Sequence, residues 1–553
     1  MRWKAICSCS FRSRSWALTY SSLPAYTEAK KKWLCCPLYG RHPFRREGLS
    51  VLSINRAFSE ETPASLQEHF ETFREHTIGI GQYITTPYGR QPLLYADWTA
   101  SGRLYEPIER RLQESFGPYV SNPHTESNTT GLTMTLAYAE ARRIIKKHVN
   151  AEPQDALLFC GNGTTGAVNK LQRLLGLKLP EWLPDDQAAS AEDRPVIFIS
   201  HMEHHSNLLP WQEGLGDVVT VPPDAEGNID VTQLETLLLA YRHRRFKIGS
   251  FTACSNVTGI QTPYPKLAAA MHRHGGVCFV DFAASAPYEP IDMHPASPLE
   301  KLDAIFFSPH KFLGGPGTGG ILVLDTALCR NQLPDEPGGG TVVWVNPWGG
   351  RRYIDTVEIR EDGGTPGFMQ AFRTALCLNL KEQMNGVGHY MVLREQELCQ
   401  ALLRGLRKIP GLSLLAGSHT RRHGIVSFNL HNIHYNLAVK LLNDRFGIQA
   451  RGGCSCAGPY GHHLLGLSPE FSSRFVEALN AGNQSLKPGW VRLSLHPIMT
   501  NKEVERILEA VRSIISHINE WQQDYCYNAS TNSWVHTRST DETEAQVRRM
   551  FTF

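Results

Sequence analysis

The sequence predicts an α/β fold with a mostly parallel main sheet, followed by a smaller α+β region. Short β-branched or aromatic runs alternate with helical stretches from about residue 130 to residue 324. After about residue 385 a long amphipathic helix precedes short, separated strands. The 553-residue composition is that of a globular chain, with 41% hydrophobic and 20% charged residues, which excludes a mainly disordered or collagen-like protein.

The alternating region contains seven expected strands with helices between them. The strands are 156–160, 196–200, 217–221, 246–254, 277–281, 304–308 and 321–324. A turn at 163–166 leads into one helix, and others are expected at 231–243 and 264–274. Ligands of such sheets collect at the carboxyl ends of the strands, so polar residues that directly follow a strand are the candidate site.

The C-terminal region has a different pattern. Helices are expected at about 388–408, 436–446 and 501–520, and strands at 413–417, 425–430 and 490–495. The expected organisation is a basic segment (1–58), an N-terminal segment packing on both domains (59–130), a large domain (131–384), a small α+β domain (385–521) and a loose polar tail (522–553).

The net charge of +3 is unevenly distributed. Residues 1–58 contain eleven Lys and Arg against two acids, whereas the remainder has 45 basic and 51 acidic residues. The acid-free stretch 1–27 and the RAFS sequence at 56–59 predict a mitochondrial presequence. A basic N-terminus on a cytoplasmic protein, or a misassigned gene start, is the alternative. The acidic body argues against nucleic acid as a partner, and no apolar run reaches the roughly 18 residues of a membrane-spanning helix.

Two charged residues close neighbouring expected strands. Lys311 ends the sequence SPHK before a glycine-rich loop, where a partly desolvated lysine can form a Schiff base, although an ordinary surface lysine is the simpler alternative. Asp281 ends its strand, where a carboxylate suits a protonated pyridine nitrogen; a helix cap or salt bridge is the structural alternative.

Three further polar groups follow other strands. Thr164 and Thr165 open a helix, and backbone N–H groups and hydroxyls at such a turn can bind phosphate. His204 can stack on a planar ring, and the Asn256 amide can reach a ring hydroxyl. Five strand ends with such groups predict one converging site.

The ordered motifs GTT, MEHHSN, SNVTG, VDFAA, SPHK, GGTP, RGGCSCA and VRLSLH resemble the class V aminotransferase-like enzymes. These are pyridoxal phosphate (PLP)-dependent enzymes of fold type I, and the resemblance is closest to the cysteine desulfurase and selenocysteine lyase group. It covers about residues 90–515. It implies PLP as cofactor, an amino acid as substrate and a homodimer with shared active sites.

The resemblance also implies roles for individual residues. Lys311 would hold PLP and later move protons on the substrate, with Asp281 on the pyridine nitrogen and His204 stacked on the ring. Asn256 would reach the ring hydroxyl. The phosphate would be held by Thr164, Thr165, Ser308 and His310, and completed by Thr365 of the partner subunit. Arg492 would bind the substrate α-carboxylate through a bidentate fork, with Arg451 as a second anion contact.

The loop RGGCSCA carries the group that decides the reaction. Cys456 matches the family's nucleophile, which takes sulfur from an amino acid as a persulfide and releases alanine; Cys454 could receive or resolve it. A purely structural loop is one alternative. A metal site made by Cys454, Cys456, His462 and His463 is another, although this spacing is not a recognised zinc motif.

Some positions depart from the desulfurase pattern. Ala284 stands where many desulfurases have a glutamine, and Cys454 and Ser455 replace the usual histidines before the nucleophile. Lys311 and Asp281 remain, so the departures concern the reaction rather than the cofactor. The expected function is a cysteine desulfurase-like activity with a protein sulfur acceptor. The alternatives are transamination, epimerisation or a lyase step by the same cofactor, and a non-catalytic scaffold or sulfur-relay protein.

Overall fold

The computed structural model describes residues 65–178, 190, 192–538 and 542–552. The elements described here belong to one compact unit, Pro63–Phe553. The basic segment expected at 1–58 and its processing sequence lie outside the described residues.

The main sheet confirms the predicted mostly parallel, seven-stranded arrangement. Its strand order is β4-β10-β9-β8-β7-β5-β6, and only β10 runs antiparallel to its neighbours. The strands are β4 (Asp155–Cys160), β5 (Val196–Ser200), β6 (Asp217–Val221), β7 (Lys247–Thr252), β8 (Val277–Asp281), β9 (Ala304–Phe307) and β10 (Gly320–Asp325). Each of the seven expected strands coincides with one of these within a few residues.

Both faces of this sheet are covered by helices. Alternate residues of a strand point to opposite sides, so neighbouring residues of one strand pack in different clusters. In β5, Ile197 and Ile199 pack in a cluster that contains Leu171 of α4 (Gly163–Leu174) and Trp211 of α5 (Leu209–Gln212). Phe198 belongs to the core on the other face. That core includes residues of α3 (Thr129–His148), α6 (Val231–Ala240), α7 (Tyr264–Arg273) and α9 (Phe368–Asn385).

The turn expected at 163–166 is instead the first turn of α4, which begins at Gly163. Gly163 has a φ of +56°, and a Cβ at this position would lie 2.9 Å from the Ser308 hydroxyl oxygen. Glycine here therefore lets the start of the helix approach the end of β9 closely.

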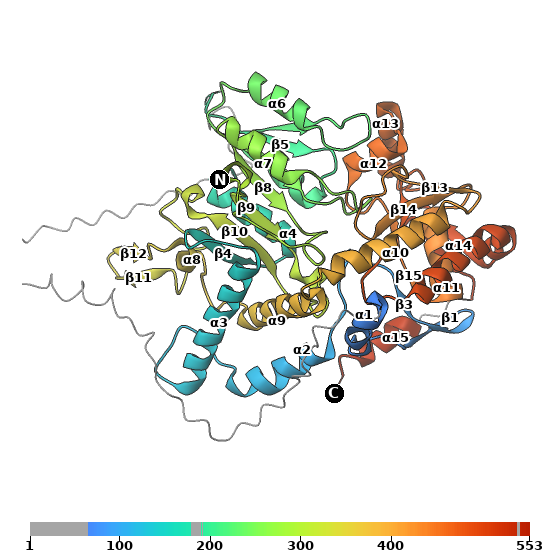
Figure 1. Cartoon of the computed structure of the whole chain (residues 1–553), viewed down its shortest axis with the longest axis horizontal. Helices are drawn as coiled ribbons and strands as arrows, with labels where there is room; N and C mark the ends of the chain where they lie inside the picture. Colours follow the sequence, from blue (N-terminus) through green and yellow to red (C-terminus); the bar gives the residue numbers. More distant parts are fainter. Residues whose placement is uncertain (1–64, 179–189, 191, 539–541, 553) are drawn as a thin grey trace, which may run out of the picture. The chain divides into compact units, whose positions relative to one another are not determined.

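A second, four-stranded sheet forms the C-terminal part, as expected (Figure 1). Its order is β13-β14-β17-β16, all antiparallel. These strands are β13 (Leu412–Leu414), β14 (Ile425–Leu430), β16 (Arg451–Gly453) and β17 (Trp490–Ser494). The helices here are α10 (Tyr390–Leu406), α11 (Tyr435–Phe446), α12 (Gly458–Leu465), α13 (Pro469–Asn480) and α14 (Asn501–Trp521), and α14 packs on α10 and α11.

The N-terminal segment is attached to this second sheet. Strand β3 (Leu94–Tyr95) pairs in parallel with β15 (Ile448–Gln449), and Asp97 forms a parallel bridge with Ser494.

The other elements are α1 (Leu66–Glu75), β1 (Tyr83–Thr86), β2 (Gly89–Pro92), α2 (Glu106–Arg111), β11 (Val342–Val345), β12 (Arg351–Tyr353), α8 (Val357–Arg360) and α15 (Glu542–Arg549). No helix in the described ranges is long and apolar enough to cross a membrane.

Residues 525–536 correct the expectation of a loose tail. They form a hairpin of β18 (Tyr525–Asn528) and β19 (Ser533–His536) against α11. Tyr525 is buried, and its hydroxyl donates to the Asp444 carboxylate at 3.0 Å. The amide of Asn532 donates to the Tyr435 hydroxyl at 2.6 Å. These contacts join residues about 80 to 100 positions apart, which local polarity does not reveal.

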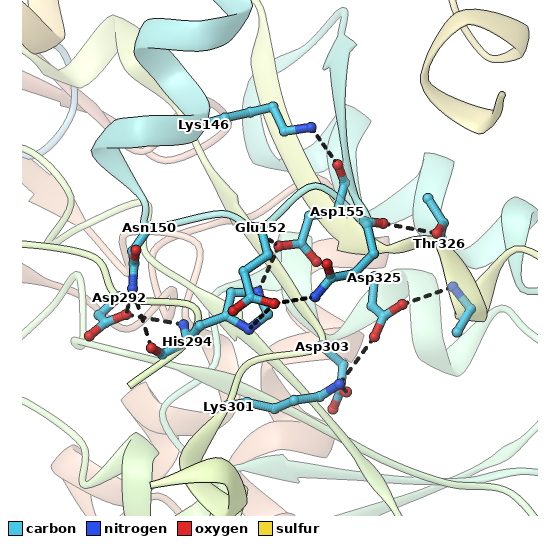
Figure 2. Close-up of polar contacts among 12 residues, drawn as sticks. Lys146, Asn150, Glu152, Asp155, Asp292, His294, Lys301, Asp303, Asp325 and Thr326 are labelled. Atoms are coloured by element: carbon cyan, nitrogen blue, oxygen red, sulfur yellow. Dashed lines mark hydrogen bonds and ion pairs between the residues drawn. The ribbon is translucent and has the colours of Figure 1, made fainter. Parts of the chain in front are cut away.

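The amino ends of the parallel strands are tied together by polar contacts (Figure 2). At the start of β4, the Asp155 carboxylate lies 2.7 Å from the His294 ring, and the Lys146 ammonium donates to the Asp155 carbonyl at 2.6 Å. The Lys301 ammonium lies 3.1 Å from Asp325 at the end of β10. The opposite, carboxyl end of the sheet carries the candidate site.

Candidate active site

A cavity of about 500 Å³ lies where the carboxyl ends of the main strands face β16 and β17. This volume is in the range of small-molecule sites. Every predicted site residue except Thr365 lines it: Thr164, Thr165, His204, Asn256, Asp281, Ser308, His310, Lys311, Arg451, Cys456 and Arg492. The convergence predicted from the strand ends is therefore present in the structure.

Lys311 and Asp281 form the charged centre of the cavity. Lys311 ends a 3-10 turn directly after β9, and Asp281 is the last residue of β8. Burial lowers the pKa of Lys311 to about 8, against the opposing effect of Asp281. Burial also raises the pKa of Asp281 to about 6, opposed by a hydrogen bond of 2.8 Å from the Ala283 N–H and by Lys311. At pH 7 to 8 this pair combines a carboxylate with a substantial fraction of neutral amine.

The turn that holds Lys311 packs against the N-terminal segment. The Gly102 N–H donates to the His310 carbonyl at 2.8 Å. A Cβ on Gly102 would lie 1.9 Å from the Phe312 carbonyl oxygen, so the close approach requires glycine. The N-terminal segment thus contacts the residues on either side of Lys311, His310 and Phe312.

The first turn of α4 lines one end of the cavity. The Thr164 N–H and the Thr164 hydroxyl both lie 2.9 Å from the Ser308 hydroxyl. The N-cap residue, Asn162, makes no side-chain hydrogen bond to this terminus, so the Ser308 hydroxyl is the side chain that meets its N–H groups. The nearby His310 has its pKa lowered to about 4 by burial and by Lys311, which keeps the ring neutral at pH 7.

His204 is fixed by a short hydrogen-bonded chain. The Thr165 hydroxyl lies 2.6 Å from the Ser206 hydroxyl, which lies 3.1 Å from His204 Nδ1. The Ser206 N–H also donates to Nδ1, so the ring proton resides on Nε2. Burial, together with Lys311, lowers the pKa of His204 to about 3. A neutral, oriented imidazole is suited to stack on a planar ring.

Arg492 and Arg451 extend from neighbouring strands of the second sheet and share one carboxylate. The Arg492 Nη2 and Arg451 Nε groups each donate to a different oxygen of Asp97 at 2.9 Å. Arg492 is buried and also donates to the Asn256 carbonyl at 3.1 Å, while its Nε atom is buried without a hydrogen-bond partner. This Nε atom is therefore a buried donor whose hydrogen-bonding capacity is unused.

The cysteine loop (residues 454–457) enters the cavity from the second sheet. Ser455 and Cys456 both adopt left-handed backbone conformations, with φ of +53° and +55°, which are strained for residues with a Cβ. The Asn256 amide donates to the Ser455 carbonyl at 2.7 Å, and the His205 N–H donates to the Cys456 carbonyl at 2.9 Å. The Gly458 N–H donates to the His205 ring at 3.0 Å. The main sheet thus holds this loop at the cavity.

Within this loop the structure distinguishes the two thiols. Cys456 is exposed and lines the cavity, whereas Cys454 packs partly buried against an apolar cluster that contains Met202 and Tyr460. The ring nitrogens of His462 are bonded to the Gly458 carbonyl and the Ser472 hydroxyl. In the part of the chain that the structure describes, no three His, Cys, Asp or Glu side chains are arranged to hold a metal.

Thr365 lies apart from the other predicted residues. It is exposed in the segment between α8 and α9 and does not line this cavity. A role for it at this site would therefore require a second subunit.

Several groups at the cavity were not predicted from the sequence. Asp97 pairs with both arginines, and Thr99, Thr252, Cys254 and Thr318 line the cavity. A signal existed for the first two, because the polar sequence DWTASG directly follows the apolar run LLYA. The others sit within or beside motifs already selected.

Comparisons with known proteins agree with this arrangement. The aminotransferase class-V family model matches residues 94–507. A cysteine desulfurase from Pectobacterium atrosepticum is 29% identical over 433 residues, covering 77% of this chain and 93% of that protein. The structure of a cysteine desulfurase from Thermococcus onnurineus has a TM-score of 0.62 at 25% identity, covering 77% of this chain and 95% of that one.

A cysteine desulfurase structure from Escherichia coli has a TM-score of 0.61 and covers 81% of this chain and 98% of that one. At 23% identity it shows the shared fold alone. The family match spans the main sheet, the first turn of α4, Lys311 and the cysteine loop. The chain belongs to the class-V aminotransferase family, which has the PLP-dependent fold type I.

Proposed function

We propose that this chain is a PLP-dependent cysteine desulfurase that converts L-cysteine to L-alanine and takes the sulfur onto Cys456. The observation that carries this proposal is the presence of Cys456 in the same cavity as Lys311, Asp281 and Arg492. The names of the relatives support the same reaction.

The residues present fit PLP. Lys311 would hold it covalently through Nζ, with Asp281 at the pyridine nitrogen. The first turn of α4, together with Thr164, Thr165, Ser308 and His310, would hold the phosphate, and His204 would stack on the ring. The helix N-terminus with its adjoining hydroxyls supports a phosphate at that end, and the buried carboxylate supports a protonated ring nitrogen.

When bound, PLP withdraws electrons from the α-carbon of an amino acid. The protein's own groups do the rest. Arg492, which lines the cavity, binds the α-carboxylate through its guanidinium group. Lys311, with its lowered pKa, moves protons on the substrate near neutral pH.

Cys456 accepts the sulfur. Its thiolate attacks the sulfur of L-cysteine, an S–S bond forms, and the C–S bond of the substrate breaks. The electron pair of that bond stays on the carbon, which takes up a proton to give L-alanine. The enzyme is left with a persulfide on an exposed residue, from which a protein acceptor can remove the sulfur.

A homodimer is part of the proposal. Thr365 would complete the phosphate site of the other subunit, and its exposure outside its own cavity supports this. The nearby β11–β12 hairpin exposes apolar side chains, including Val345 at 64% and Trp348 at 87%. Sedimentation should give twice the chain mass of 62.0 kDa. A monomeric protein that binds PLP as tightly as the dimer would contradict the proposal that the two subunits share their active sites.

The function is tested by incubating the purified protein with L-cysteine and a reductant, then measuring alanine and sulfide. Wild type should form both, Cys456→Ser should form neither above background, and Cys454→Ser should retain activity as the matched control. Equal alanine formation by Cys456→Ser would reject the nucleophile. Amino transfer to a keto acid without sulfide would indicate transamination instead.

We also propose that residues 1–58 direct the protein to mitochondria, because this stretch combines eleven basic residues with only two acids. A fluorescent protein fused to residues 1–60 should co-localise with mitochondria. Diffuse cytoplasmic fluorescence would support the alternative.

A further inference from the structure

We propose that Asp97 is the positioning residue that limits the carboxylate-binding side of the cavity to one net positive charge, and so selects amino acids with a single carboxylate and an uncharged side chain. This inference rests on the proposed function, because it concerns the same substrate. It adds a substrate class and the residue that sets it.

The first observation is the register of the second sheet. Arg451 of β16 and Arg492 of β17 are direct cross-strand partners. Like charges directly opposite each other destabilise an antiparallel pair. Asp97 compensates this repulsion, because its two oxygens each accept a hydrogen bond of 2.9 Å from a different arginine.

The second observation is how firmly Asp97 is held. Its carboxylate is only 11% exposed, and the Thr99 N–H donates to the Ser494 hydroxyl at 2.9 Å. The Ser494 N–H donates to the Ala96 carbonyl at 2.7 Å, and Trp98 stacks on His496 at 4.2 Å between ring centres. A substrate would therefore bind beside Asp97 without displacing it.

The third observation is the charge balance of the whole cavity. Among the lining residues, Lys311 is opposed by Asp281. The two lining arginines are opposed by Asp97, which pairs with both but does not itself line the cavity. His204 and His310 are neutral at pH 7, because burial lowers their pKa values. One positive charge therefore remains at the arginines, enough for one carboxylate.

A second carboxylate on the substrate would find no uncompensated cation. The groups near Lys311 that line the remaining wall are uncharged, including Cys254, Ala284 and Thr318. A dicarboxylic amino acid would lose the hydration of its second charge without replacement. L-cysteine meets the requirement, and so do other amino acids with small neutral side chains.

The test measures binding of acids that lack an amino group, and so does not depend on turnover. Calorimetry on the PLP-loaded protein compares 3-mercaptopropionate, with one charge, and succinate, with two. Wild type should prefer the monoanion. Asp97→Asn should shift the ratio of the two dissociation constants toward succinate by about tenfold, because it leaves two uncompensated guanidinium groups.

Two variants separate charge from structure. Asp97→Glu keeps the carboxylate and should retain the wild-type preference. Asp335 also pairs with two cations, Arg173 at 2.7 Å and Lys170 at 3.2 Å, but neither cation lines the cavity, so Asp335→Asn should leave the ratio unchanged. An unchanged ratio in folded Asp97→Asn overturns the proposal, and so does an equal shift in Asp97→Glu or Asp335→Asn.

If Asp97→Asn does not fold, Arg451→Gln provides the opposite change. It removes one cation and should weaken the binding of both acids, that of succinate more strongly. An unaltered ratio of the two dissociation constants again overturns the proposal. A protein that shows the expected ratios but forms no alanine fails only the proposed function. One that forms alanine but shows no ratio change fails only this inference.

Discussion

The residues that close the main strands and the cysteine loop face the same cavity, but they are held there differently. Thr164, Asp281 and Ser308 are buried at the ends of a sheet covered on both faces. Cys456 is exposed and strained, and its loop is held by a hydrogen bond from Asn256 to the Ser455 carbonyl and one from His205 to the Cys456 carbonyl. The groups proposed to bind the cofactor are thus part of the core, whereas the proposed nucleophile is held by a few hydrogen bonds. Such a difference would suit a thiol that first meets the substrate and then an acceptor.

The largest expected effect comes from the fixed side. Lys311→Ala should remove the yellow absorbance of bound PLP and lower alanine formation by about 100-fold or more, because both covalent attachment and proton transfer are lost. Absorbance spectra and an alanine assay measure this. Cys456→Ser is the control and should keep the absorbance; loss of colour in that variant would show that the two regions are not separable.

The next effect concerns pH. Because the pKa of Lys311 is about 8, the neutral amine increases as pH rises through 8, and PLP uptake by the apoprotein should accelerate over that interval. Asp281 raises this pKa, so Asp281→Asn should move the midpoint to lower pH while weakening PLP binding by about tenfold. Stopped-flow absorbance measures both. A midpoint near 10 in the wild type would contradict the assignment.

A smaller effect is expected on the loop side. His205→Ala removes the acceptor for the Gly458 N–H and should lower the rate of persulfide formation by about fivefold, the value of one hydrogen bond, with unchanged PLP absorbance. His205→Gln supplies another acceptor and should restore much of the rate. His463→Ala is the control, because His463 stacks on Tyr460 rather than bonding the loop. A changed absorbance in His205→Ala would place this residue with the cofactor groups instead.

The smallest effect tests the strain itself. Ser455→Gly should stabilise the observed conformation of the cysteine loop by about 1 kcal/mol. Glycine tolerates the left-handed backbone, and the buried Ser455 hydroxyl that is removed has no hydrogen-bond partner. Hydrogen exchange of the loop amides should slow by about fivefold. Gly453 has a φ of +111°, so Gly453→Ala should speed exchange. The same direction of change in both variants would contradict strain as the cause.

Most of the cavity was predictable because its polar groups follow recognisable strands. Lys311 and Asp281 end apolar runs, and the carboxyl ends of parallel strands share one edge, so proximity followed from topology. Asp97 was not predicted, because its role depends on arginines more than 350 positions away. The hairpin at 525–536 was missed for the same reason: its buried contacts are with α11, not with its own neighbours.

The fold class, the order of the cavity motifs and the resemblance to class V enzymes could be predicted from the amino-acid sequence, because they depend on local periodicity and motif order. Which of the two nearby thiols lines the cavity is known only from the tertiary structure. The two residues are chemically identical, but Cys456 has a left-handed backbone and faces the cavity, whereas Cys454 packs against an apolar cluster. The tertiary structure also decided that one carboxylate serves two arginines, because strand register, not sequence distance, places those three charges together.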